Sequence, residues 1–216
     1  MYLSERLLLW WHRLQTRRKM ERVFSRREDP FQYRSSSDER ARLDAMEAAV
    51  ADRRYDWALE AGCAEGDFTA RLVRLADRVT ALDISPVALS RARARLRGDG
   101  GVEFVEEDIR RWTPTPGRRL SLIVLGDILY YLDKPLVRPQ FERFFPSLVS
   151  WLDPGGRLLL AHGFAGERER AHRRGFRERF ERLGLRLVKE TTVGAGLSAG
   201  PVSCLLCVLE KTLLPR

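Results

Sequence analysis

The chain has 216 residues, 44% of them hydrophobic, a size and composition that suit one large domain with an appendage. It contains no stretch of about 18 uninterrupted apolar residues and does not begin with the pattern of a cleaved signal, so we expect a cytoplasmic protein without a membrane-spanning helix. The formal net charge is +9, but residues 1–27 hold eight basic side chains against two glutamates and so carry six of these charges, which makes charge alone a weak argument for a nucleic-acid partner.

Residues 1–55 are predicted to form a helical extension and a lid ahead of the main domain. A first helix is indicated by apolar side chains that recur on one face, with arginines on the others. These apolar residues are Leu3, Leu7, Trp10, Trp11 and Leu14. Through residues 1–24 such a face could lie on an anionic membrane surface or contact a partner subunit, and it could equally fold back on the domain.

Residues 56–216 alternate short leucine-rich or β-branched runs with amphipathic segments of helical length, which is typical of an α/β domain around a largely parallel sheet. We expect strands at 56–62, 78–84, 102–108, 120–127, 157–163, 185–192 and 203–211. We expect helices at 66–76, 86–97, 135–152 and 167–183. The second helix should begin at Pro86 after the N-cap Ser85. The glycine-rich stretch GAGLSAGP joins the last two strands and predicts an antiparallel hairpin at the sheet edge.

The stretch ALEAGCAEGDFT, residues 58–69, joins the first strand to its helix through a tight turn that contains Gly62 and Gly66. Backbone at such a junction comes close to a ligand. Glu65 and Asp67 at the helix start would repel a pyrophosphate, so we expect a ligand that carries an ammonium or sulfonium charge.

The segment Glu60–Gly66, EAGCAEG, resembles motif I of class I S-adenosylmethionine-dependent methyltransferases, with Ala64 in place of the middle glycine. The second, third and fourth predicted strands end in segments that occur in the same order in that family. These segments are VTALDIS, VEFVEEDI and SLIVLGD, and the turn LDPGG comes after them. The resemblance implies a Rossmann-like fold with a seven-stranded sheet, and S-adenosyl-L-methionine as the cofactor.

By this resemblance the cofactor contacts belong to the turn and to the strand ends. Asp83, with Ile84 beside it, would bind the ribose hydroxyls through paired carboxylate oxygens. Asp108 and Ile109 would contact the adenine. Glu60 is expected to support the turn by accepting backbone N–H groups, with contact to the methionine amino group of the cofactor as the alternative. The small residues are expected to let backbone approach the ligand. These small residues are Gly62, Cys63, Ala64, Gly66 and Gly126.

Four residues beyond the strand ends are candidates for the chemistry. Asp127 could hold an amine or hydroxyl acceptor or take its proton, and His162 could act as a general base near neutral pH. Tyr130 and Tyr131 could pack against the acceptor or the sulfonium, and we expect one of them to be buried and one to face the pocket. A hydrogen-bonded His162 at the strand end, without a catalytic role, is an equal alternative.

The segment DPFQYRSSSDERARLDAM, together with LYYL after the fourth strand, is similar to the nodulation protein S group of small N-methyltransferases. By that resemblance Tyr33, Arg34 and Ser36 would close over the methionine end of the cofactor. The expected reaction is methyl transfer to N or O of a small-molecule, sugar or glycolipid-like acceptor. An RNA methyltransferase and a non-catalytic cofactor-binding protein remain alternatives, and the oligomeric state stays open.

Three cysteines, Cys63, Cys204 and Cys207, have no spacing typical of a metal site or a disulfide framework. We therefore expect buried free thiols and no metal ion.

Overall fold

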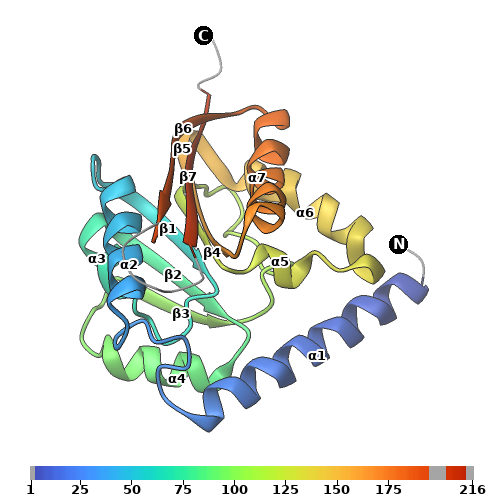
Figure 1. Cartoon of the computed structure of the whole chain (residues 1–216), viewed down its shortest axis with the longest axis horizontal. Helices are drawn as coiled ribbons and strands as arrows, with labels where there is room; N and C mark the ends of the chain where they lie inside the picture. The colour runs from blue at the N-terminus through green and yellow to red at the C-terminus, as the bar shows by residue number, and fades with distance from the viewer. Residues whose placement is uncertain (1–2, 195–202, 213–216) are drawn as a thin grey trace.

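A single seven-stranded sheet organises the protein in the computed structural model, which describes residues 3–194 and 203–212 (Figure 1). The strands are Tyr55–Ala61 (β1), Ala76–Asp83 (β2), Val102–Glu106 (β3), Leu120–Gly126 (β4), Leu152–Phe164 (β5), Leu185–Val193 (β6) and Ser203–Lys211 (β7). Their order across the sheet is β3-β2-β1-β4-β5-β7-β6. The first five strands pair in parallel and β7 is antiparallel to both of its neighbours, so the predicted topology is confirmed.

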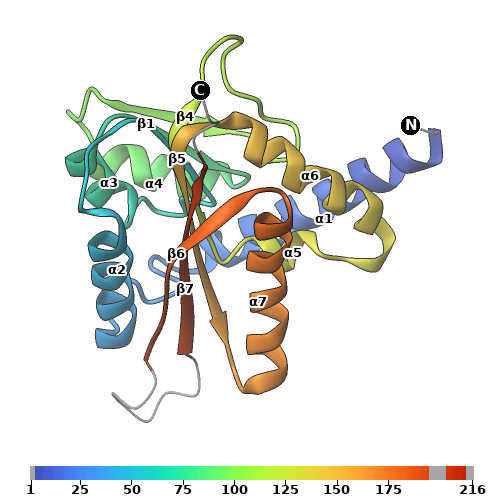
Figure 2. The same ribbon diagram turned by 90° about the horizontal axis from the view of Figure 1, so that it is seen from above.

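Helices cover both faces of the sheet (Figures 1 and 2). They are Leu3–Arg26 (α1), Ser37–Val50 (α2), Thr69–Leu75 (α3), Pro86–Arg95 (α4), Leu129–Leu132 (α5), Pro135–Val137 (η1, a 3-10 helix), Arg138–Trp151 (α6) and Glu167–Arg182 (α7). Alternate side chains of β5 show the two layers: Leu158 and Leu160 pack with α6 and α7, while Leu159 and Ala161 face the cluster that contains α2 and α3. Both faces of the central strands are therefore buried, as a doubly covered parallel sheet requires.

Helix α1 folds back over the domain through one face only. Met20 and Phe24 pack with Ala64, Ala88 and Tyr131 at the carboxyl ends of the strands. On the predicted apolar face Leu7, Trp10 and Trp11 are exposed instead, and Leu14 is half-buried. The helix is thus folded back on the domain through Met20 and Phe24, but Leu7, Trp10 and Trp11 remain exposed.

Three element predictions need correction. The helix predicted at 135–152 is divided into η1 and α6, and α5 precedes them. The helix predicted from residue 66 begins at Thr69, since Gly66 has a φ of +80° and belongs to the turn. Helix α2 was not foreseen as an element, although Ser36 caps it by accepting a hydrogen bond from the Glu39 backbone N–H.

The cysteines are free and buried, as predicted. Among the described residues no three metal-ligating side chains cluster, and no described helix is long and apolar enough to cross a membrane. Most of the predicted glycine-rich connection between β6 and β7 lies outside the described residues.

Candidate active site

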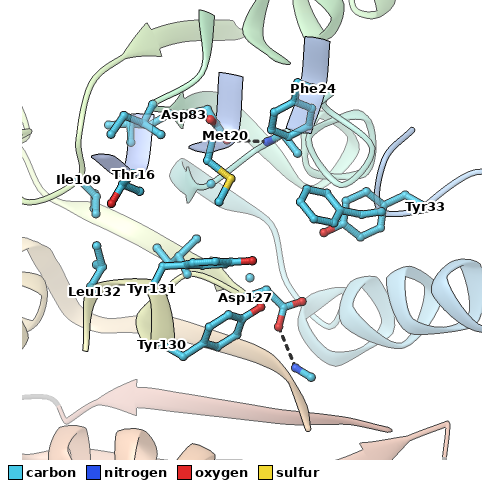
Figure 3. A pocket seen from close by; sticks show the side chains of 18 of the residues that line it. Thr16, Met20, Phe24, Tyr33, Asp83, Ile109, Asp127, Tyr130, Tyr131 and Leu132 are labelled. Atoms are coloured by element: carbon cyan, nitrogen blue, oxygen red, sulfur yellow. Dashed lines mark hydrogen bonds between the residues drawn. The ribbon is translucent and has the colours of Figure 1, made fainter. Parts of the chain in front are cut away.

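A cavity of about 430 Å³ lies at the carboxyl ends of β1, β2 and β4, beneath α1 and beside α5 (Figure 3). This is the edge of an open parallel sheet at which ligands bind, and the volume is in the range of small-molecule sites. Eleven predicted site residues line it: Tyr33, Gly62, Ala64, Asp83, Ile84, Asp108, Ile109, Gly126, Asp127, Tyr130 and Tyr131.

The turn after β1 brings backbone to the cavity wall. Gly62 has a φ of +78° and its N–H donates to the Leu82 carbonyl at 2.7 Å. A Cβ at this position would lie 2.4 Å from Cγ2 of Ile128. Ala64 has a φ of +49°, a left-handed conformation that glycine adopts more easily, which explains why the related motif has glycine there.

Asp83 ends β2 with its carboxylate tied to the turn. Oδ2 accepts the Ala64 N–H at 3.0 Å and Oδ1 accepts the Ser85 N–H at 2.8 Å. Burial raises the pKa of this carboxyl, while its backbone hydrogen bonds lower it. Each carboxylate oxygen has two lone pairs, so Asp83 can still accept hydrogen bonds from a ligand in the cavity.

Asp108 is less available to a ligand than the sequence suggested. Arg110 donates to Oδ1 through Nε at 2.9 Å and to Oδ2 through Nη2 at 2.5 Å. Burial favours the neutral acid, but the Arg110 guanidinium outweighs it and holds the pKa of Asp108 below its ordinary range. The neighbouring Ile109 is buried and forms an apolar wall of the cavity with Leu132.

Asp127 forms an ion pair with Arg42 inside the cavity. Its Oδ2 lies 2.5 Å from Nη2 of Arg42, and its Oδ1 accepts the Gly163 N–H at 2.8 Å. Burial opposes the charged form of Asp127, yet the Arg42 guanidinium keeps the pKa of Asp127 below its ordinary value. Nε of Arg42 is buried and has no hydrogen-bond partner among the described residues. The cavity therefore holds a fixed carboxylate beside a cation with one donor to spare.

Tyr130 and Tyr131 both line the cavity, so the expectation that only one would face it is wrong. Their ring centroids are 4.6 Å apart, because both belong to the short helix α5. The Arg173 guanidinium lies 4.5 Å from the Tyr130 ring centroid and Lys19 Nζ lies 5.0 Å from the Tyr131 ring centroid. Burial raises the pKa of both phenols, so both are neutral at pH 7.

His162 is not on the cavity wall. Its side chain points from β5 toward α7, is 2% exposed, and packs on Phe176 and Tyr130 with centroid distances of 5.5 and 6.2 Å. Burial lowers the pKa of His162 to about 4. The imidazole is therefore neutral at pH 7, and its Nε2 has no hydrogen-bond partner among the described residues.

Glu60, at the end of β1, and Cys63 and Gly66, in the turn that follows, do not line the cavity. The Thr69 hydroxyl donates to Oε2 of Glu60 at 2.6 Å, and burial raises the pKa of this carboxyl to about 8. Glu60 thus ties β1 to α3. Cys63 is buried against Ala81 and Leu89.

The acids and lid residues beside the turn pair with one another instead of facing the ligand. Glu65 accepts from Arg34 Nη2 at 2.7 Å and from Arg91 Nη1 at 2.6 Å, and Asp67 pairs with Arg95. Glu65 and Asp67 do not line the cavity, so their charge is not the reason for a cationic ligand. Arg34 and Ser36 are likewise absent from the wall, the first held by Glu65 and the second serving as the α2 cap.

Several wall residues were missed from the sequence. Thr16, Met20 and Phe24 reach the cavity from α1, as Figure 3 shows. Arg42 comes from α2 and lies on its buried face with Leu43, Met46 and Val50. An arginine at helical spacing among buried apolar positions is the signal that could have identified it.

Known proteins share this architecture. A solved structure of the N-methyltransferase NodS from Bradyrhizobium japonicum WM9 in complex with S-adenosyl-l-homocysteine has a TM-score of 0.75 at 26% identity, over 91% of this chain and 98% of that one. Magnesium protoporphyrin IX methyltransferase from Synechocystis, at 16% identity with a TM-score of 0.66, shares the fold over 93% of this chain and 97% of its own. The Rossmann-like methyltransferase fold is thereby confirmed.

Curated relatives match over a shorter stretch. Nodulation protein S of Sinorhizobium fredii is 31% identical over 61% of this chain and 59% of its own length. Trans-aconitate 2-methyltransferase of Paracidovorax citrulli is 33% identical over 61% of this chain and 48% of its own length. The chain thus spans about three fifths or less of these relatives. The family model of nodulation protein S (NodS) matches residues 15–174, well over half of the chain, so the chain belongs to the NodS family.

Proposed function

We propose that this chain is an S-adenosyl-L-methionine-dependent methyltransferase that methylates a nitrogen of a small-molecule acceptor. Family membership and the S-adenosyl-l-homocysteine complex of the related NodS support this proposal. The observation that carries it is the cavity itself, which Asp83, the Gly62 turn and the Arg42–Asp127 pair all line.

The cavity residues fit the two ends of the cofactor. At the nucleoside end, Asp83 would accept hydrogen bonds from the ribose hydroxyls, and Ile84, Ile109 and Leu132 supply an apolar surface for the base. At the amino-acid end, the spare Nε donor of Arg42 would bind the carboxylate and Asp127 would attract the ammonium. A zwitterion matches this pair better than a neutral or a purely anionic group.

When bound, S-adenosyl-L-methionine supplies a methyl group on a sulfonium that is displaced in line by the acceptor. The chain has to orient the acceptor and exclude water. Asp127 is a weak base because Arg42 stabilises its anion, so we assign it the holding of an N–H group and not proton removal. No histidine lines the cavity among the described residues, and a neutral amine needs no base before it attacks, which favours nitrogen over a hydroxyl oxygen.

The arginines of α7 give little support to the alternative of an RNA substrate. On α7, Arg174 and Arg177 pair with Glu190, and Arg179 pairs with Glu142. Because these cations are neutralised within the protein, they offer little attraction to phosphates. The fold alone is compatible with reactions other than methyl transfer, since the [4+2]-cyclase SpnF shares it at 16% identity with a TM-score of 0.62.

Isothermal titration calorimetry with S-adenosyl-L-homocysteine tests the cofactor assignment. We expect Asp83→Ala to weaken binding at least about tenfold, or about 1.4 kcal/mol, because the ribose loses its acceptor. Asp77→Ala is the matched control, since Asp77 lies at the opposite end of β2 and pairs with Arg54 on the surface. Absence of binding by the native chain, or unchanged affinity in the Asp83 variant, would refute the assignment.

Transfer of a labelled methyl group to a panel of small amines and to matched alcohols tests the reaction. The proposal expects label in the amines. Label only in the alcohols would overturn the choice of nitrogen, and cofactor binding without any transfer would point to the non-catalytic alternative.

A further inference from the structure

Helix α1 carries an apolar stripe that the described part of the chain leaves mostly exposed, with Leu14 half-buried. Leu7 and Trp10 are each 59% exposed, Trp11 is 49% exposed and Leu8 is 38% exposed. Leu7, Trp11 and Leu14 follow one another at intervals of four and three residues, so they share one side of the helix. Large apolar side chains gathered on one exposed side of a helix indicate a contact surface.

The opposite side of α1 already binds the domain, which leaves the stripe facing outward. Met20 and Phe24 are buried over the cavity. Arg13 pairs with Glu107 at 2.7 Å, and Arg17 pairs with Glu106 at 2.7 Å. The N-terminal part of the helix reaches beyond the other helices (Figure 2). Rotation of α1 to bury the stripe would break these contacts.

Cations continue the same side of the helix toward its C-terminus. Arg18 and Arg22 follow Leu14 at intervals of four residues, and both are exposed. We call Leu7, Trp11, Leu14, Arg18 and Arg22 the outer stripe. Helix α1 as a whole has seven basic side chains against Glu5 and Glu21. The outer stripe therefore combines an apolar half with a positively charged half.

We propose that the outer stripe binds the surface of an anionic lipid bilayer, with α1 lying in the plane of the interface. Tryptophan and leucine would enter the headgroup region while the arginines pair with lipid phosphates. A second copy of the chain fits less well, because a parallel pair of outer stripes brings Arg18 and Arg22 close to their own counterparts, and an antiparallel pair buries these cations against apolar side chains. No described helix is suited to cross a bilayer, so the contact is with its surface.

Flotation with lipid vesicles tests the proposal on the full chain. Vesicles of phosphatidylcholine with roughly one third phosphatidylglycerol should carry the protein, and vesicles of phosphatidylcholine alone should not. Raising the salt from about 0.1 M to about 0.5 M should release it, since the cations act through screened attraction. Binding should shift the tryptophan emission to shorter wavelength as Trp10 and Trp11 leave water.

Two variants separate the apolar and charged contributions. Trp10→Ser/Trp11→Ser and Arg18→Glu/Arg22→Glu should each reduce vesicle binding at least about tenfold. Leu183→Ser/Val188→Ser is the matched control, because these are exposed apolar residues away from α1, and it should float like the native chain. Unchanged S-adenosyl-L-homocysteine affinity and circular dichroism show that the variants remain folded.

Three results would overturn the proposal. The first is no flotation with anionic vesicles. The second is equal flotation of the native chain and both α1 variants. The third is a dimer in light scattering that the tryptophan variant dissociates, which would assign the outer stripe to a second copy. None of these outcomes depends on methyl transfer, so the methyltransferase assignment stands or fails separately.

Discussion

We propose that Arg42 gives the cavity a preference for an amino-acid group. We expect Arg42→Met to lower the affinity for S-adenosyl-L-homocysteine at least about tenfold, about 1.4 kcal/mol, because a charge-assisted hydrogen bond to the carboxylate is lost. Methylthioadenosine has the same nucleoside and thioether without the amino acid, so its affinity should not change. Calorimetry with both ligands measures the difference.

Loss of Arg42 also leaves the half-buried Asp127 without its charged partner, which costs at most about 3–5 kcal/mol of stability. Arg42→Met/Asp127→Asn removes that unpaired charge and should still discriminate between the two ligands. Arg71→Met is the control, since Arg71 pairs with Glu47 outside the cavity. An equal loss of affinity for both ligands would mean that Arg42 supports the cavity wall and does not bind the carboxylate.

Glu60 makes the stability of the protein depend on pH. Burial raises its pKa to about 8 from an ordinary value of 4.5, so the folded chain retains a proton that the unfolded chain has released. Its stabilising contribution is complete below about pH 4.5 and is lost as the pH rises through about 8. Glu60→Gln should therefore gain stability over the native chain across that window, by about 3–5 kcal/mol at most.

Urea unfolding of both chains between pH 5 and 9 would show a difference that grows with pH. Glu103→Gln replaces an exposed glutamate on β3 and provides the baseline. A difference between Glu60→Gln and the native chain that does not vary with pH would show that Glu60 is ionised in the folded protein.

The turn between β1 and α3 is the element whose shape the cavity depends on. Gly62 has a φ of +78° and its Cβ position is blocked by Ile128, whereas Gly117 has the same φ with nothing within 4 Å. Gly117→Ala thus reports the backbone cost alone, and Gly62→Ala adds a clash. We expect Gly62→Ala to lose about 2–4 kcal/mol of unfolding free energy and Gly117→Ala about 1–2 kcal/mol.

Chemical denaturation of the two alanine variants measures these losses. Gly62→Ala/Ile128→Ala should recover the part caused by the clash. Equal destabilisation of Gly62→Ala and Gly117→Ala would show that the turn shifts freely, and the close approach of backbone to the cavity would not be essential.

Helices and strands were predicted correctly where a local sequence pattern determines their bounds. Strand β2 and helix α4 follow from an apolar run, the Ser85 cap and Pro86, and the structure has them at those places. The partition of 129–151 into α5, η1 and α6 was not predicted, because Pro135, Pro139 and Pro146 permit both an early helix start and a break. Helix α2 was not predicted, because the buried Arg42 interrupts the pattern of apolar residues on its buried side.

At the scale of the whole molecule, the sheet order follows from chain topology and the cavity walls do not. Parallel strands with right-handed crossovers place β1 and β4 side by side, so Gly62 and Gly126 could be assigned to one edge from the sequence. Contacts between side chains that are far apart in the sequence could not be predicted from the chain topology. The contacts of Phe24 with Ala64 and of Arg42 with Asp127 depend on how α1 and α2 pack.

Because the cavity wall draws on α1, α2, α5 and three strands, only the folded chain can bind the cofactor product. S-adenosyl-L-homocysteine at about a hundredfold excess over its dissociation constant should therefore stabilise the native chain by about 2.7 kcal/mol. For a chain of this size that raises the melting temperature by about 5–10 °C, measurable by scanning calorimetry.

The same concentration of NAD should not raise the melting temperature, since the carboxylates of Asp83 and Asp127 line the cavity and would repel a pyrophosphate. The shift with S-adenosyl-L-homocysteine should shrink in Asp83→Ala and persist in Asp77→Ala. A shift with NAD and none with S-adenosyl-L-homocysteine would place a dinucleotide in the cavity, because stabilisation at fixed ligand excess reports which compound binds the native fold.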